Sequence, residues 1–201
     1  MDDAGGLRLA YLDPPYLGCC ARYGHHHGDH GGGCWDEVAT HVELIAWACS
    51  RFDGWALSAS SSSLRDLLPA CPAEIRVAAW VKPFCAFKTG VRPAYTWEPV
   101  VFWRGRNPSG GHRHDWRASS TPRDHLAEPV TMRRGLVGAK PARFCTWVLD
   151  LLGAEAGDEL TDVFPGTGAF AAAAEARAGR YPAGTLWGVD GPRSTVDGAG
   201  P

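Results

Sequence analysis

Four consecutive residues near the N-terminus, Asp13-Pro14-Pro15-Tyr16, combine groups that could hold a planar amine. The Asp13 carboxylate accepts hydrogen bonds, and the Tyr16 ring offers a flat surface on which the group bearing the amine can stack. Two successive prolines fix the backbone and remove two amide donors, so the segment neither continues a sheet nor starts a helix at once. The pattern predicts a stiff loop that presents an acceptor, with a purely structural turn as the alternative.

A second candidate site lies far along the chain, in the segment Asp162-Val163-Phe164-Pro165-Gly166-Thr167-Gly168. Its glycines let the backbone turn sharply and approach a ligand at a helix N-terminus. No Gly-Lys-Ser/Thr follows, which excludes a Walker loop, and the GxGxxG signature fails at Ala171. Asp190 follows Gly168 by 22 residues, at the end of a further apolar run, where a carboxylate can hold ribose hydroxyls. The pattern indicates a nucleotide-type ligand.

Short apolar runs alternate with segments of helical period along the chain. We expect strands over residues 7–12, 54–59, 75–81, 98–103, 157–164 and 185–189, and helices over about 35–51, 64–68, 142–152 and 169–178. This alternation predicts an α/β fold with a mostly parallel, Rossmann-like sheet. Ligands bind such sheets beyond the carboxyl ends of the strands, so both candidate segments should face one crevice.

Composition is consistent with one domain spanning residues 1–201, with 45% apolar and 21% charged residues. A formal charge of −2 gives no general attraction to polyanions. Residues 104–143, however, hold nine Lys or Arg against three acids, a local balance of +6. We interpret residues 104–139 as a basic loop that contacts nucleic-acid phosphates, with a solvated or disordered loop as the alternative. Its candidate contact residues are Arg104, Arg106, Arg113, Arg117, Arg133 and Arg134.

The compartment and metal content follow from what the sequence lacks. There is no apolar run of 18 residues and the chain opens Met1-Asp2-Asp3, so we expect a cytoplasmic protein with no membrane span. Seven cysteines without a CxxC pair fit reduced thiols. A zinc site in residues 19–34 is an alternative, but the usual paired ligand spacings are absent, so we expect no metal. Its candidate ligands would be Cys19, Cys20, His25, His26, His27, His30 and Cys34.

These motifs resemble those of a known family. Asp13-Pro14-Pro15-Tyr16 resembles the DPPY catalytic motif of adenine-specific DNA amino-methyltransferases, and residues 162–168 resemble their DPFxGxG motif for S-adenosylmethionine. The order, catalytic loop first and cofactor loop last, is similar to the permuted group called the beta class, in which Lys-Pro precedes a helix and the cofactor strand, here Lys140-Pro141. Residues 78–105 also resemble the central part of a small bacterial and phage group of DNA methylases. The resemblance covers most of residues 7–190.

The resemblance implies a Rossmann-like methyltransferase sheet in permuted order. Because the chain ends eleven residues after Asp190, we expect this sheet to be one strand short, or completed by a homodimer or partner subunit. The basic stretch replaces the usual target-recognition domain. The cofactor, S-adenosylmethionine, would be bound by Lys140, Asp162, Phe164, Gly166, Thr167, Gly168 and Asp190.

The resemblance also implies a reaction, methyl transfer to the exocyclic amine of adenine in DNA. Asp13 and the carbonyl of Pro14 or Pro15 would accept the two amine hydrogens, and Tyr16 would stack on a base that has left its duplex. No metal is required. The alternatives are the same chemistry on a cytosine amine or an RNA adenine, and a catalytically inactive nucleic-acid-binding or partner subunit.

Overall fold

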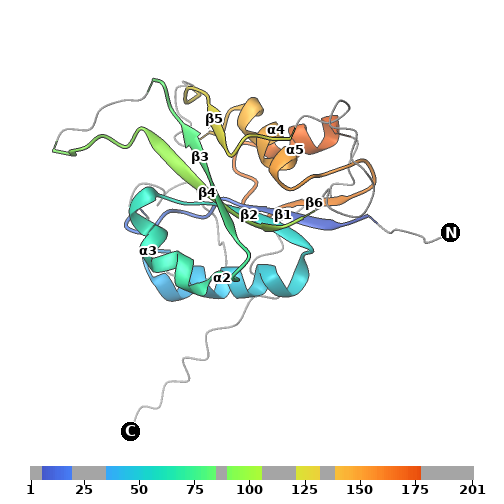
Figure 1. Ribbon diagram of the computed structural model, residues 1–201, viewed down its shortest axis with the longest axis horizontal. Helices are drawn as coiled ribbons and strands as arrows, with labels where there is room; N and C mark the ends of the chain where they lie inside the picture. The colour runs from blue at the N-terminus through green and yellow to red at the C-terminus, as the bar shows by residue number, and fades with distance from the viewer. Residues whose placement is uncertain (1–5, 20–34, 85–89, 106–120, 132–138, 178–201) are drawn as a thin grey trace, which may run out of the picture.

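The computed structural model describes residues 6–19, 35–84, 90–105, 121–131 and 139–177 (Figure 1). Asp190 and its predicted strand lie outside these ranges, as does the histidine- and cysteine-rich segment after Cys19. Five of the six candidate nucleic-acid contacts also lie outside them: Arg106, Arg113, Arg117, Arg133 and Arg134. No helix within the described ranges is long and apolar enough to span a bilayer.

A six-stranded sheet with the order β5-β3-β4-β2-β1-β6 forms the centre of the molecule. The strands are β1 (Arg8–Leu12), β2 (Gly54–Ser58), β3 (Arg76–Val81), β4 (Trp97–Arg104), β5 (His125–Ala127) and β6 (Glu159–Asp162). The first and last of these strands, β1 and β6, are parallel neighbours. The α/β prediction and five of the predicted strands are therefore confirmed.

The sheet is mixed, because β4 runs antiparallel to both of its neighbours, β2 and β3. The parallel pairs are β1 with β2, β1 with β6, and β3 with β5. A parallel crossover usually needs a helix, whereas antiparallel neighbours do not. The described part of the β3–β4 connection contains no helix, which fits the reversed direction of β4.

The interpretation of residues 104–139 as a continuous loop is wrong at two places. Arg104 is the last residue of β4, and residues 125–127 form β5 at the edge of the sheet. Sequence patterning missed β5 because a three-residue strand has no measurable period. It forms because its backbone pairs with β3 and Leu126 is buried against the core.

Helices cover both faces of the sheet (Figure 1). They are α2 (Val38–Arg51), α3 (Leu64–Leu67) with 3-10 turns at Ser61–Ser63 and Leu68–Ala70, α4 (Ala142–Leu151) and α5 (Ala169–Ala176). Alternate residues of β1 enter opposite cores, because side chains alternate across a strand. Leu9 and Tyr11 pack on the side of α4 and α5, whereas Ala10 and Leu12 pack on the side of α2. β1 is thus buried on both faces, which fixes the position of the loop that follows it.

Asp158 joins the starts of β1 and β6. Its side chain is fully buried; Oδ1 accepts a hydrogen bond from the Leu7 amide and Oδ2 accepts one from the Glu155 amide, each at 2.8 Å. Asparagine offers only one acceptor oxygen, so its NH₂ group would face one of these two amide donors. We expect Asp158→Asn to lower the free energy of unfolding by about 2 kcal/mol. Urea unfolding checks this value, and a change near zero would contradict it.

Candidate functional site

The two candidate segments lie side by side at one edge of the sheet. Asp13 follows β1 directly, and Tyr11 of β1 pairs with Asp162, the last residue of β6. The amide of Val163 donates to the Tyr11 carbonyl at 3.0 Å, so the chain leaves β6 next to the point where it leaves β1. Both segments therefore lie at the carboxyl ends of neighbouring parallel strands, as the sequence predicts.

The glycine-containing loop has the geometry expected of a strand-to-helix turn. Asp162 accepts a hydrogen bond at Oδ1 from the Phe164 amide at 3.2 Å. Gly168 has a φ of 74°, a left-handed conformation that favours glycine, and it precedes the first residue of α5. Thr167 is exposed at the tip of the loop. Phe164 is buried and meets the Trp35 ring edge-on at 5.2 Å, so its ring belongs to the core.

Lys140 contacts the loop formed by residues 13–16. Its ammonium is 3.0 Å from Asp13 Oδ1, 2.9 Å from the Tyr16 hydroxyl and 3.5 Å from Glu98 Oε2. The side chain is only 9% exposed and its Nζ lies within 6 Å of three aromatic rings, those of Tyr16 (5.3 Å), Trp80 (5.7 Å) and Phe144 (5.8 Å). The resemblance implies that Lys140 binds the cofactor; the structure places it against Asp13 and Tyr16.

Two further charged residues complete this cluster. Glu98, near the start of β4, accepts a hydrogen bond from the Tyr16 hydroxyl at 3.0 Å. Lys82, just after β3, forms an ion pair with the other oxygen of Glu98. Three charged side chains, those of Asp13, Glu98 and Lys140, therefore contact the Tyr16 hydroxyl, and Lys82 is linked to them through Glu98. We call Asp13, Lys82, Glu98 and Lys140 the charge cluster.

Sequence reasoning missed Glu98. The signal was an acid inside the apolar strand Trp97–Arg104, where a buried carboxylate needs a partner. That partner comes from other strands and loops, which a single sequence does not pair.

Burial and neighbouring charges determine the protonation of these groups. Burial raises the pKa of Asp13 above its usual value, and Lys140 opposes that rise. Burial lowers the pKa of Lys140, but Asp13 and Glu98 more than offset this and hold it well above its usual value. Burial also raises the pKa of Glu98, and Lys140 and Lys82 outweigh it, so the net shift is downward. Lys140 thus favours the charged forms of both buried carboxylates, although the net shift of the pKa is upward for Asp13 and downward for Glu98.

Asp162 lies in a different environment. Burial, and then the charge of Asp13, raise its pKa to about 7. No ion pair within the described ranges involves Asp162, and its one recorded donor is the Phe164 amide. A buried acid that has no cationic partner among the described residues, next to a glycine loop, fits a ligand that carries positive charge.

Arg104 lies at the opposite end of the strands from Asp13. It pairs with Gly54, the first residue of β2, whereas Asp13 lies beyond the last residue of β1. The Arg104 guanidinium stacks over the Trp103 ring at 4.3 Å from its centroid. Among the described site residues, the structure therefore does not bring Arg104 together with Asp13 or Tyr16.

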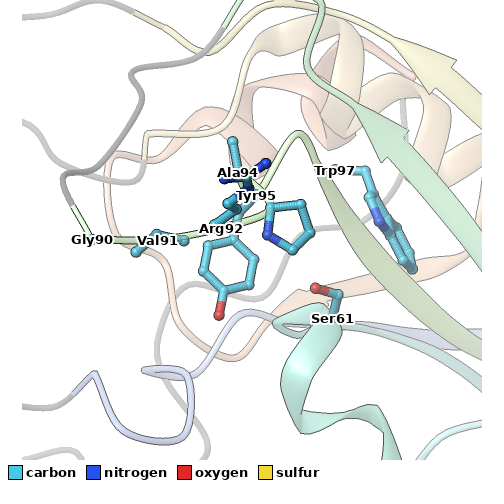
Figure 2. A pocket seen from close by; sticks show the side chains of 8 residues that line it. Ser61, Gly90, Val91, Arg92, Ala94, Tyr95 and Trp97 are labelled. Carbon is cyan, nitrogen blue, oxygen red and sulfur yellow. The ribbon is translucent and has the colours of Figure 1, made fainter.

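A separate hollow of about 360 Å³ is shown in Figure 2. Ser61, which follows β2, and the segment before β4 form it. Tyr95 and Trp97 line it with partly exposed rings, and Arg92 adds a positive charge.

Solved structures of three proteins share this fold. The PvuII DNA methyltransferase, which is cytosine-N4-specific, aligns with a TM-score of 0.55 over 88% of this chain and 73% of its own, at 13% identity. M1.HpyAVI in complex with S-adenosylmethionine gives 0.53 over 88% and 82%, also at 13% identity. The protein TTHA0409 of Thermus thermophilus gives 0.54 over 88% and 79%, at 16% identity. The sequence matches no protein-family model and no curated protein sequence.

These likenesses establish the Rossmann-like fold that the sequence predicts. The expected strand over 185–189 falls outside the described residues, so the prediction that the sheet is one strand short stays a prediction.

Proposed function

We propose that this protein transfers a methyl group from S-adenosylmethionine to the exocyclic amine of adenine in DNA. The observation that carries the proposal is the position of Asp13 and Tyr16 at the carboxyl end of β1, next to the glycine loop that follows β6. An amine acceptor, a stacking ring and a helix N-terminal loop then meet at one edge. The fold shared with the PvuII DNA methyltransferase supports methyl transfer to an amine in DNA, without choosing between adenine and cytosine.

The cofactor would be held at the glycine loop. The Gly166 and Gly168 backbone would take its methionine end, and the basis for the fit is the buried acid Asp162, which has no ion pair among the described residues and suits a cationic ligand. When bound, S-adenosylmethionine supplies an activated methyl group. Asp190 would hold the ribose hydroxyls, as the resemblance implies.

The residues around β1 would prepare the amine. The lone pair of an adenine amine is delocalised into the ring, which makes the nitrogen a poor nucleophile. Asp13 and the carbonyl of Pro14 or Pro15 would accept its two hydrogens and favour a pyramidal nitrogen. The nitrogen would gain the methyl group as the bond between the methyl carbon and the cofactor sulfur breaks, and it would release one proton, which the Asp13 carboxylate at the loop would accept. Tyr16 would hold the base by stacking after it leaves the duplex.

Nucleic-acid binding would come from residues around the basic stretch. Arg106, Arg113, Arg117, Arg133 and Arg134 remain candidates for phosphate contacts. Arg104 is a weaker candidate, because it lies at the opposite end of the strands from Asp13. Base-sequence specificity would rest on this stretch and on the hollow lined by Trp97.

The same chemistry on the cytosine amine is the second candidate. The observation that favours it is the likeness to a cytosine-N4-specific enzyme, since Asp13 and Tyr16 can hold an amine on either ring. The basicity of the ring and the size of the pocket would then decide the substrate.

Incubation with radiolabelled S-adenosylmethionine, followed by nucleoside analysis, tests these assignments. Unmethylated DNA and RNA are compared, with Asp13→Ala as the control. We expect the label in methyladenine from DNA. Label in methylcytosine supports the second candidate, and label from RNA alone would contradict DNA as the substrate. Cofactor binding without transfer to either polymer would support an inactive subunit.

A further inference from the structure

We propose that Lys140 and Glu98 are positioning residues of the amine-accepting loop: Lys140 fixes one oxygen of Asp13, so that the other oxygen receives the substrate amine. This inference rests on the proposed function and assigns Lys140 to the catalytic loop in place of the cofactor site.

The donors of Lys140 carry the argument. An ammonium has three N–H donors, and three acceptors lie within 3.5 Å of Nζ, namely Asp13 Oδ1, the Tyr16 hydroxyl and Glu98 Oε2. The side chain is 9% exposed, so water supplies little of its solvation. No donor remains for a cofactor without breaking one of these contacts.

The Asp13 carboxylate is held asymmetrically. Oδ1 is 3.0 Å from Lys140, whereas no hydrogen bond to Oδ2 occurs within the part of the chain that the structure describes. Oδ2 is thus the oxygen that can accept an amine hydrogen. An amine acceptor works best when its carboxylate is already fixed, because it then loses no rotational freedom when the substrate binds.

Glu98 acts through Tyr16 and Lys140. The Tyr16 hydroxyl has one hydrogen, and its shorter contact is to Glu98 at 3.0 Å, against 3.5 Å to Asp13. It therefore donates to Glu98 and accepts from Lys140, which fixes the ring orientation for stacking. Lys82 holds the other oxygen of Glu98, so Glu98 stays in place.

Removing either residue should change the ionisation of Asp13, in opposite directions. Lys140 favours the charged form of Asp13 and Glu98 disfavours it. The groups that face Asp13 are Lys140, Glu98, Tyr16, Tyr11, Asp162 and Cys145, with Lys82 behind Glu98. Of these, Lys140 is the one cation in direct contact within the described residues.

The test compares the pH dependence of kcat for Lys140→Met and Glu98→Gln with wild type. We expect the acid limb to move up by about 1 to 3 pH units in Lys140→Met and to move down in Glu98→Gln, because methyl transfer needs ionised Asp13. At about pH 7 we expect kcat of Lys140→Met to fall about 10- to 100-fold, with the Kd of S-adenosylmethionine changed less than about twofold. The matched control is Arg143→Met, which removes an exposed charge in the first turn of α4 and should leave both unchanged.

The outcomes separate this inference from the proposed function. Wild-type protein that transfers no methyl group to DNA or RNA contradicts the proposed function, whatever the variants do. If wild type is active, a Kd for S-adenosylmethionine raised more than about tenfold in Lys140→Met, with the acid limb unmoved, overturns the inference and returns Lys140 to the cofactor site. If Lys140→Met does not fold, Glu98→Gln decides alone: a downward shift supports the inference and an unmoved limb overturns it.

Discussion

Replacing Asp13 by alanine is expected to lower kcat for methyl transfer about 10³-fold, while the Kd of S-adenosylmethionine stays close to that of wild type. Asp13 lies at the end of β1 and the cofactor loop at the end of β6, so truncating Asp13 removes the amine acceptor and leaves the glycine loop intact. Rapid-quench assays on a DNA duplex with labelled cofactor measure kcat, and titration calorimetry measures the Kd.

Asp13→Asn should be nearly as inactive as Asp13→Ala, although it preserves the shape of the side chain. Lys140 donates to the position of Oδ1, so the amide oxygen must lie there and the NH₂ group must replace Oδ2. A donor would then face the hydrogens of the substrate amine. When Asp13→Asn is combined with Lys140→Met, the amide can rotate. The fall in kcat caused by Asp13→Asn should therefore be smaller in the Lys140→Met background than in wild type.

Two results of this double-variant cycle would contradict the roles assigned to Asp13 and Lys140. If Asp13→Asn retains more than about a tenth of the wild-type kcat, the acceptor role of Asp13 is contradicted. If the loss on Asp13→Asn is equal with and without Lys140, the two residues do not act together.

The sequence predicted the segments that carry the site because their signals are local. Two prolines after an apolar run mark the end of β1. The glycines at 166 and 168 mark the start of α5, where Gly168 has a positive φ. The carboxyl ends of neighbouring parallel strands lie together, so the adjacency of Asp13 and Asp162 follows from the fold class. Helix and strand bounds agree to within about three residues for the same reason.

The contacts between segments were beyond sequence reasoning. Lys140 was assigned from the position of Lys-Pro before a helix, which places its backbone but not its ammonium. Glu98 faces the site only because β4 runs antiparallel, so that the start of β4 lies at the same edge as the end of β2. Strand direction depends on a connection without local signals, so the sequence also does not show that Arg104 lies at the opposite end of the strands from Asp13.

Asp162 should make the protein less stable as pH rises from about 4 to about 7. Its pKa in the folded protein is raised to about 7 by burial and by Asp13. In the unfolded chain an aspartate ionises near about pH 3.9, so within this window the folded protein holds a proton that the unfolded chain has lost. The stabilisation is therefore complete below the unfolded pKa and disappears as pH passes through the folded pKa.

Asp162→Asn should abolish this dependence and raise the free energy of unfolding at about pH 8 by about 2 to 4 kcal/mol, because the amide keeps the acceptor for the Phe164 amide and carries no charge. Urea unfolding across the pH range measures the change in slope. An unchanged slope in Asp162→Asn would contradict the raised pKa.

A carboxylate that destabilises the empty protein at neutral pH is explained if a cationic ligand compensates it. Asp162→Asn should therefore also weaken binding of the sulfonium cofactor more than binding of its neutral demethylated product, and equal losses for the two would separate Asp162 from the charge of the ligand.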